Sequence, residues 1–112
     1  MTTEWDALPE TVKTFMTALD AREDSRALAT FTTDAVVTDE GRDYAGRADI
    51  GAWLTDAVSE YTYTTTFTGA TTTDTTIDVG QHLEGNFPGG VADLHYRFTL
   101  DGALISRLVI EP

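Results

Sequence analysis

Two ionisable side chains, Asp39 and Arg107, are the residues of this sequence best suited to acid/base chemistry. Asp39 follows the β-branched segment 35–38 and precedes Glu40-Gly41, so we expect it where a strand enters a loop. A carboxylate among apolar groups has a raised pKa and can act as a general base. Arg107 could hold a carboxylate or stabilise an enolate. Asp39 is thus a candidate catalytic base and Arg107 a candidate catalytic electrophile.

Both residues also have ordinary structural explanations. Asp39 and Glu40 form an acidic pair of the kind that is common in solvated loops. Arg107 could form a structural ion pair with Asp39 or Glu111, because a buried guanidinium needs a partner. The residues alone leave these alternatives open.

Five further residues are predicted to bind a ligand: Tyr96, Gln81, Trp53, Phe15 and Phe98. The polar pair, Gln81 and Tyr96, is expected at facing positions of neighbouring strands, where it would supply polar contacts. The three other aromatic side chains are predicted to line the walls of an apolar pocket, although such residues are often plain core.

His82 and His95 suggest a metal site, because Glu84 and Asp93 are close to them in the sequence and the two imidazoles are expected to face each other across a hairpin. They fall on the predicted outer face of the sheet, where polar cross-strand pairs are common and no closed ligand cage is implied. We therefore predict no metal and no other cofactor. The sequence also lacks a phosphate-binding glycine loop and a nucleophile elbow, so it does not support nucleotide binding or acyl transfer.

The elements that must position these residues follow from the hydrophobic spacing. Apolar residues at helical intervals predict a helix over residues 8–21 and another over 46–58. Between them, Ser25 is expected to cap a short helix whose apolar side includes Phe31. A short strand is predicted over residues 35–38, and the segment from Gly41 to Tyr44 is predicted to be a connecting loop.

The second half of the chain predicts four strands, over residues 61–68, 76–87, 91–100 and 103–110. The last three are joined by Pro88-Gly89 and Asp101-Gly102, which are typical of hairpin turns.

The turns set the predicted register of these strands. If both are two-residue loops, Gln81 pairs with Tyr96, and Tyr96 also pairs with Arg107. This register turns Arg107 inward and His82 and His95 outward. A slip of one residue would reverse these orientations.

The order of helix, helix, short strand, helix and antiparallel strands resembles the nuclear transport factor two-like superfamily, in particular its SnoaL-like and ketosteroid isomerase-like members. The resemblance covers nearly the whole chain and implies an α+β fold, with a curved, mostly antiparallel sheet wrapped around N-terminal helices. Such a cystatin-like cone has a central pocket, and we expect residues 1–112 to form a single domain of this kind. The residues that carry the resemblance are Phe31, Asp34-Ala35-Val36, Gly46-Arg47, Ile50, Trp53-Leu54 and Asp101-Gly102.

The likeness to ketosteroid isomerases bears on the chemistry. Residues 11–39 align with that family without a gap, and Asp39 falls on the position of the aspartate that moves the proton. The two residues that donate hydrogen bonds to the enolate oxygen in that family are matched by Phe15 and Leu94, which cannot donate. Because one lost donor of this kind costs about 100- to 1000-fold in rate, the resemblance argues against ketosteroid isomerase activity itself.

Composition excludes several classes of function. The chain of 112 residues has no cysteine and a net charge of −12, with Lys13 as its single lysine. This charge disfavours binding to nucleic acid or to anionic membranes. No basic segment followed by an apolar run opens the sequence, so we expect a cytoplasmic protein.

These observations lead to three hypotheses. The first is a cofactor-free enzyme of the SnoaL-like type, an isomerase, cyclase or hydrolase that acts on a hydrophobic carbonyl or enol compound. The second is a domain of the same fold that binds a small hydrophobic molecule without chemistry. The third is a structural dimer with a filled core. Under each of them we expect a homodimer through the outer face of the sheet.

Overall fold

The computed structural model describes residues 2–57 and 60–112. Three α-helices lie in the first half of the chain, and a π-helical turn, η2 (Trp53–Ala57), continues the third. The helices are α1 (Glu10–Asp20), α2 (Asp24–Leu28) and α3 (Gly46–Ala52), with a 3-10 turn, η1 (Trp5–Ala7), before them. The strands are β1 (Thr2–Thr3), β2 (Phe31–Asp39), β3 (Arg42–Ala45), β4 (Tyr63–Thr73), β5 (Thr76–Gly85), β6 (Val91–Asp101) and β7 (Leu104–Glu111).

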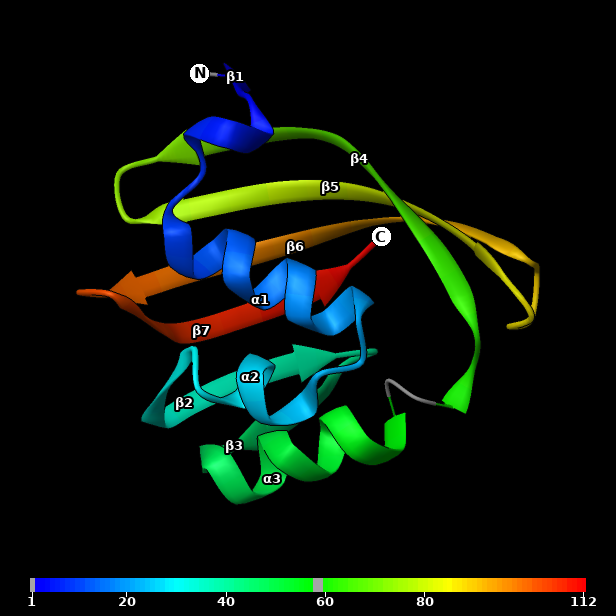
Figure 1. Cartoon of the computed structure of the whole chain (residues 1–112), viewed down its shortest axis with the longest axis horizontal. Coiled ribbons are helices and arrows are strands. Elements are labelled where there is room, and N and C mark those ends of the chain that lie inside the picture. Colours follow the sequence, from blue (N-terminus) through cyan, green and yellow to red (C-terminus); the bar gives the residue numbers. More distant parts are fainter. Residues whose placement is uncertain (1, 58–59) are drawn as a thin grey trace.

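The strands of the described residues form one seven-stranded sheet in the order β1-β4-β5-β6-β7-β2-β3. Neighbours are antiparallel except β2 and β7, which run parallel. Figure 1 shows that the sheet is strongly curved and that α1 lies across its concave side. This arrangement confirms the predicted α+β fold. None of the helices in the described residues is long and apolar enough to cross a membrane.

The core forms where α1 meets the concave face of the sheet. The apolar residues of α1, predicted from their helical spacing, are buried, and Phe15 lies at the centre of the cluster. Its ring makes edge-on contacts with Phe31 at 5.3 Å and with Phe98 at 5.7 Å between centroids. Edge-to-face geometry of this kind is favourable between aromatic rings. Phe15 and Phe98 are therefore core residues.

The second helix is shorter than predicted, and Phe31 belongs to β2. The helix stops at Leu28, and Thr30 forms hydrogen bonds that do not continue it. The Thr30 hydroxyl donates to the Ala27 carbonyl at 2.6 Å, and the Thr30 carbonyl accepts from the backbone N–H of Ile105 at 2.8 Å. This second bond joins the chain to β7. The predicted cap at Ser25 is also wrong, since α2 begins at Asp24.

The segment predicted to be a connecting loop after Asp39 is instead the edge strand β3. It forms a hairpin with β2 in which Asp39 pairs with Arg42. The two turn residues, Glu40 and Gly41, have φ values of 53° and 75°. Positive φ at both central residues is what a two-residue hairpin requires. The hairpin fixes Asp39 at the last position of β2.

The turn between β5 and β6 is longer than the predicted two residues. A hydrogen bond from the Gly85 N–H to the Gly90 carbonyl closes it at 3.0 Å. As a result Gln81 pairs with Leu94 and not with Tyr96, which pairs with Val79. The shift is an even number of residues, so the side chains of β5 and β6 keep their predicted faces.

The register of β6 and β7 differs from the prediction in a way that changes the faces. Thr99 pairs with Arg107 but Leu100 pairs with Ile105, so Ser106 is the extra residue of a β-bulge. Beyond the bulge every β7 side chain is reversed relative to the prediction. Leu108 and Ile110 are buried, and the prediction that Arg107 points inward is wrong.

A second irregularity bends β4. Phe67 pairs with Gln81 and Gly69 with Gly80, so Thr68 has no partner in the ladder. A Cβ atom at Gly80 would lie 2.6 Å from the Thr68 hydroxyl, so a larger residue there would have to displace the Thr68 side chain. In Figure 1, β4 is strongly curved and reaches around the concave side of the sheet.

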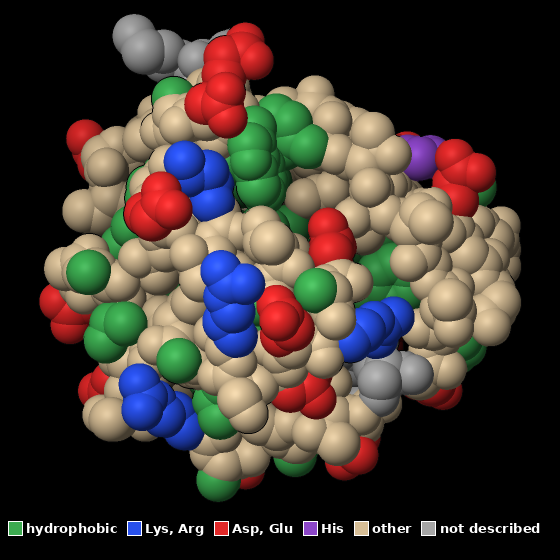
Figure 2. All heavy atoms as spheres, viewed as in Figure 1, with side chains coloured by type: hydrophobic (Ala, Val, Ile, Leu, Met, Phe, Trp, Pro, Cys, Tyr) green, Lys and Arg blue, Asp and Glu red, His purple; other side chains and the backbone are tan. Residues whose placement is uncertain are grey.

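The negative charge of the chain is not gathered in one place. On the face seen in Figure 2, acidic side chains are scattered over several elements, with Lys and Arg side chains between them. On this face, therefore, the acidic side chains do not form a single patch.

Candidate functional site

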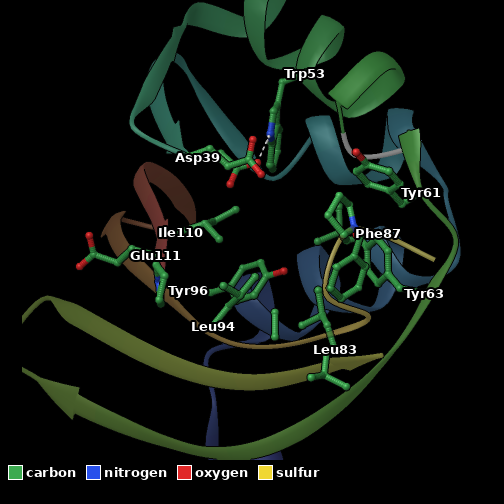
Figure 3. A pocket seen from close by; sticks show the side chains of 16 residues that line it. Asp39, Trp53, Tyr61, Tyr63, Leu83, Phe87, Leu94, Tyr96, Ile110 and Glu111 are labelled. Atoms are coloured by element: carbon green, nitrogen blue, oxygen red, sulfur yellow. Dashed lines mark hydrogen bonds between the residues drawn. The ribbon is translucent and has the colours of Figure 1, made fainter. Parts of the chain in front are cut away.

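One pocket of about 500 Å³ opens on the concave side, between the end of α1, η2 and the bent strands. Figure 3 shows most of its labelled side chains pointing toward a common space, while Glu111 points away from it. Most of them are apolar or aromatic, and a few are acidic. Its lining residues are Leu19, Asp39, Glu40, Trp53, Tyr61, Tyr63, Leu83, Phe87, Pro88, Val91, Ala92, Leu94, Tyr96, Ile110, Glu111 and Pro112. This size and lining are typical of sites for small organic molecules.

Asp39 is half-buried on the pocket wall, on the same face of β2 as the buried Val37. The indole Nε1–H of Trp53 donates to Asp39 Oδ2 at 3.0 Å. Burial raises the pKa of Asp39, while the hydrogen bonds from Trp53 and from the backbone of Glu40 oppose the rise. The carboxylate is therefore a stronger base than a solvated aspartate, and one of its oxygens is already held.

Tyr96 provides a second polar group in the same pocket. Its side chain is only 3% exposed, and Figure 3 shows its hydroxyl directed into the space between Asp39 and the aromatic rings. None of the described residues forms a hydrogen bond with this hydroxyl. Burial, with smaller contributions from Tyr63 and Asp39, raises the pKa of Tyr96 far above its ordinary value. The hydroxyl thus stays protonated and can donate a hydrogen bond.

Three aromatic residues form the opposite wall. The rings of Tyr61 and Tyr63 each make an edge contact with Phe87, at 6.3 Å between centroids. The Arg22 guanidinium lies 5.0 Å from the centroid of the Tyr63 ring. Tyr63 is opposite Gly85, where a Cβ atom would be 2.5 Å from the Tyr63 Cβ. Glycine at this position is what lets Tyr63 occupy the wall.

No family model and no curated protein matches the sequence. Among solved structures, a proposed polyketide cyclase from Sinorhizobium meliloti is 29% identical, with a TM-score of 0.91 over 97% of this chain and 100% of that one. A Δ5-3-ketosteroid isomerase from a Mycobacterium species is 18% identical, with a TM-score of 0.75 over 91% of this chain and 89% of that one. The chain has the nuclear transport factor two-like fold.

A third solved structure with this fold carries a ligand. It is a Mycobacterium tuberculosis protein in complex with estradiol-17β-hemisuccinate, 15% identical, with a TM-score of 0.75 over 91% of this chain and 89% of that one. The comparison therefore confirms the predicted likeness to ketosteroid isomerase-like proteins. The likeness is to the nuclear transport factor two-like fold as a whole, and it does not identify any one activity.

Arg107 does not share the pocket with Asp39. Its side chain lies on the outer face, where Nη1 donates to the Val36 carbonyl at 3.2 Å and Nη2 donates to the Thr38 hydroxyl at 2.6 Å. The Thr38 hydroxyl in turn donates to Asp43 at 2.6 Å. The predicted pairing of base and electrophile is wrong, because the bulge at Ser106 turns Arg107 away from the concave side.

Of the five predicted ligand-binding residues, only Trp53 and Tyr96 line the pocket. Phe15 and Phe98 lie deeper, in the packed core. Gln81 is 3% exposed on the inner face, and its Oε1 accepts no hydrogen bond within the described residues. The structure thus brings Asp39, Trp53 and Tyr96 together and leaves the other three outside.

Sequence reasoning missed the aromatic wall. Phe87 was assigned to the end of a strand, whereas it lies in the turn after β5. Tyr61 and Tyr63 fall in a threonine-rich stretch that indicates an exposed strand. Their spacing of two residues, which places them on one face of a strand, is the signal that could have identified them.

The outer face carries paired charges. His82 pairs with Asp93 at 2.6 Å, and not with His95, which contacts Asp78 at 2.8 Å. Hydrogen bonds with Asp93 and then with Glu84 raise the pKa of His82. Within the described ranges no group of three or more such side chains could hold a metal ion. The homodimer expected through this face stays a prediction.

Proposed function

We propose that this protein is a cofactor-free enzyme of the SnoaL-like type that acts on a hydrophobic carbonyl or enol compound. In this proposal Asp39 moves the proton and Tyr96 donates a hydrogen bond to the substrate oxygen. One observation carries the proposal: a half-buried carboxylate and a buried phenol with no partner among the described residues line one apolar pocket of about 500 Å³.

The geometry suggests how the chemistry would proceed. Asp39 takes a proton from the carbon beside the carbonyl, and the electrons of the broken C–H bond form an enolate. Negative charge then develops on the oxygen, toward which the Tyr96 hydroxyl donates. Asp39 can return the proton at another carbon, which completes an isomerisation. General base catalysis contributes about 10²- to 10⁴-fold and one oxyanion donor about 10²- to 10³-fold.

Trp53 prepares Asp39 for this role. Its indole N–H donates to Oδ2 at 3.0 Å and so fixes the orientation of the carboxylate on the pocket wall. A carboxylate in a fixed orientation loses less entropy when the substrate binds and reacts. Trp53 is therefore a positioning residue in the proposed mechanism.

The relatives support the substrate class. The Sinorhizobium meliloti structure is that of a proposed polyketide cyclase, and the Mycobacterium tuberculosis protein holds a steroid derivative. Ketosteroid isomerases use two donors at the enolate oxygen, which are matched here by Phe15 and Leu94. Tyr96 supplies its hydroxyl from another position, so we propose proton transfer on a carbonyl compound and not ketosteroid isomerisation.

A second candidate function is ligand binding without turnover. It is favoured by the absence of any Lys, Arg or His side chain from the lining residues within the described part of the chain. An enolate in this pocket has one neutral donor and no cation to stabilise it. A pocket of the same shape could bind a hydrophobic molecule and leave it unchanged.

Hydrogen–deuterium exchange separates the two candidates without knowledge of the product. The probe is 2-tetralone in D₂O, and NMR follows the exchange of the protons beside its carbonyl. The wild-type protein should accelerate the exchange. Asp39→Asn should lower the accelerated rate by about 10²- to 10⁴-fold and Tyr96→Phe by about 10²- to 10³-fold.

The control variant is Arg107→Met, because Arg107 lies on the outer face and should leave the rate unchanged. An exchange rate that is the same in wild type and Asp39→Asn would remove Asp39 from the mechanism. Binding of 2-tetralone with no accelerated exchange in the wild type would favour the second candidate.

A further inference from the structure

The pocket carries negative charge and, among its described lining residues, no positive charge. Asp39 and Glu40 line it, and the carboxylate of Glu60 raises the pKa of Tyr61 at its mouth, with a smaller contribution from Glu40. Glu111 also lines the pocket, but its carboxylate pairs with Arg97 on the outer face. A cation inside the pocket would therefore meet an attractive field.

The basic side chain of Arg22 does not line this pocket. It lies against Tyr63 and lines a separate hollow of about 250 Å³ with Asp20 and Thr65. Its Nη2 donates to the Tyr61 carbonyl at 2.8 Å. The ring of Tyr63 thus stands between this guanidinium and the pocket.

Asp39 accepts hydrogen bonds from Trp53 and from the backbone of Glu40 but has no ion-pair partner within the described residues. Its neutral donor, Trp53, occupies Oδ2 and leaves the charge of the carboxylate uncompensated. In surroundings less polar than water, such a charge attracts a cation more strongly than an exposed carboxylate does. Asp39 is therefore equipped to bind a positively charged group.

The rest of the pocket is also suited to a cation with an apolar body. Trp53, Tyr61, Tyr63, Phe87 and Tyr96 line it with aromatic rings, whose negative faces attract a cation within about 6 Å. Tyr96 is 3% exposed, and its hydroxyl points into the pocket and has no partner among the described residues, so its oxygen can accept an N–H.

We propose that the pocket selects its ligand by charge and that the preferred ligand is a hydrophobic molecule with a protonated amine. The ammonium group pairs with Asp39, and the apolar part contacts the aromatic wall. A carboxylate ligand is repelled by Asp39. This inference rests on the pocket of the proposed function and names its substrate class. In an α-amino ketone the carbon that carries the ammonium group also carries the reacting C–H bond, so both groups can lie beside Asp39.

Three probes with one skeleton test the inference: 2-naphthylmethylamine, 2-naphthalenemethanol and 2-naphthoate. Isothermal titration calorimetry at pH 7 and low salt measures their affinities. We expect the amine to bind at least about tenfold more tightly than the alcohol, which corresponds to about 1.4 kcal/mol, and the carboxylate to bind weakest. In Asp39→Asn, which keeps the shape and an acceptor for Trp53, the amine should lose this preference and the alcohol should bind as before.

The matched control is Asp74→Asn, which removes the same charge in the turn between β4 and β5. Asp74 has a φ of 49°, a backbone conformation that asparagine adopts readily. This variant should keep the preference for the amine. An equal loss in both variants would assign the preference to the net charge of the chain and overturn the inference.

The other outcomes also decide the matter. Equal affinities for the three probes, or tightest binding of 2-naphthoate, would overturn charge selection and leave the pocket in place. Failure of all three probes to bind, in a protein that still accelerates the exchange of 2-tetralone, would overturn this inference and leave the proposed function standing. A clear preference for the amine together with no exchange of 2-tetralone would support the inference and refute the proposed chemistry alone.

Discussion

The hydrogen bond between Trp53 and Asp39 can be tested through stability. Trp53→Phe removes the indole N–H that lies 3.0 Å from Oδ2 and keeps an aromatic ring at a position that is 2% exposed. A hydrogen bond to a charged group contributes about 1.5–3 kcal/mol. The smaller ring leaves part of the space empty, at a further cost of about 1–2 kcal/mol. Trp53→Phe should therefore lower the free energy of unfolding at pH 7 by about 2.5–5 kcal/mol.

A double-mutant cycle separates these two contributions. Urea unfolding of wild type, Trp53→Phe, Asp39→Ala and the double variant should give a coupling energy of about 1.5–3 kcal/mol at pH 7, because the loss of ring volume is common to both backgrounds. The coupling should fall to about half when Asp39 is protonated, since hydrogen bonds to neutral groups are weaker. A coupling below about 0.5 kcal/mol at pH 7 would refute the view that the indole holds the carboxylate.

Two further predictions concern buried polar groups. Because burial raises the pKa of Asp39 above its unfolded value, the folded state binds the proton more tightly, so wild-type stability rises as pH falls through the folded pKa. Asp39→Asn should therefore be more stable than wild type at pH 7 and lose this advantage toward about pH 4. Urea unfolding across this pH range measures the difference. A stability advantage of Asp39→Asn that grows as the pH falls would contradict the raised pKa of Asp39. Gln81→Met should raise the free energy of unfolding by about 1 kcal/mol in the same assay, because it removes an Oε1 with no described partner at similar volume. A loss of stability in Gln81→Met would show that this oxygen has a partner.

The sequence predicted most of the fold because its strongest signals are local. The apolar spacing of α1 and α3 and the alternation in the last four strands identified these elements, and their order identified the fold. The strand β3 was missed because it has four residues, most of them exposed, and so shows no alternation. Phe31 was assigned to a helix because one apolar residue fits the end of a helix and the start of a strand equally well.

The candidate site was only partly predictable. Asp39 was found because it falls, in the alignment with ketosteroid isomerases, on the position of the aspartate that moves the proton, and because the end of the β-branched segment before it is visible in the sequence. Arg107 was placed on the wrong face because β7 has apolar residues at both sets of alternate positions, so either set could face the core. The choice between them depends on the bulge at Ser106. The bulge is a feature of the pairing between β6 and β7, so the sequence around Ser106 alone does not reveal it.

The bend of β4 has a consequence for variation among proteins of this shape. Thr68, Gly69 and Gly80 lie at the bulge, and none of them lines the pocket. They nevertheless determine how far the first half of β4, which carries Tyr63, leans over the concave side. Two chains with identical lining residues but different bulges would therefore enclose different volumes, and comparison of lining residues alone would give them the same ligand. Ligand size in such proteins is encoded partly by residues that no ligand touches.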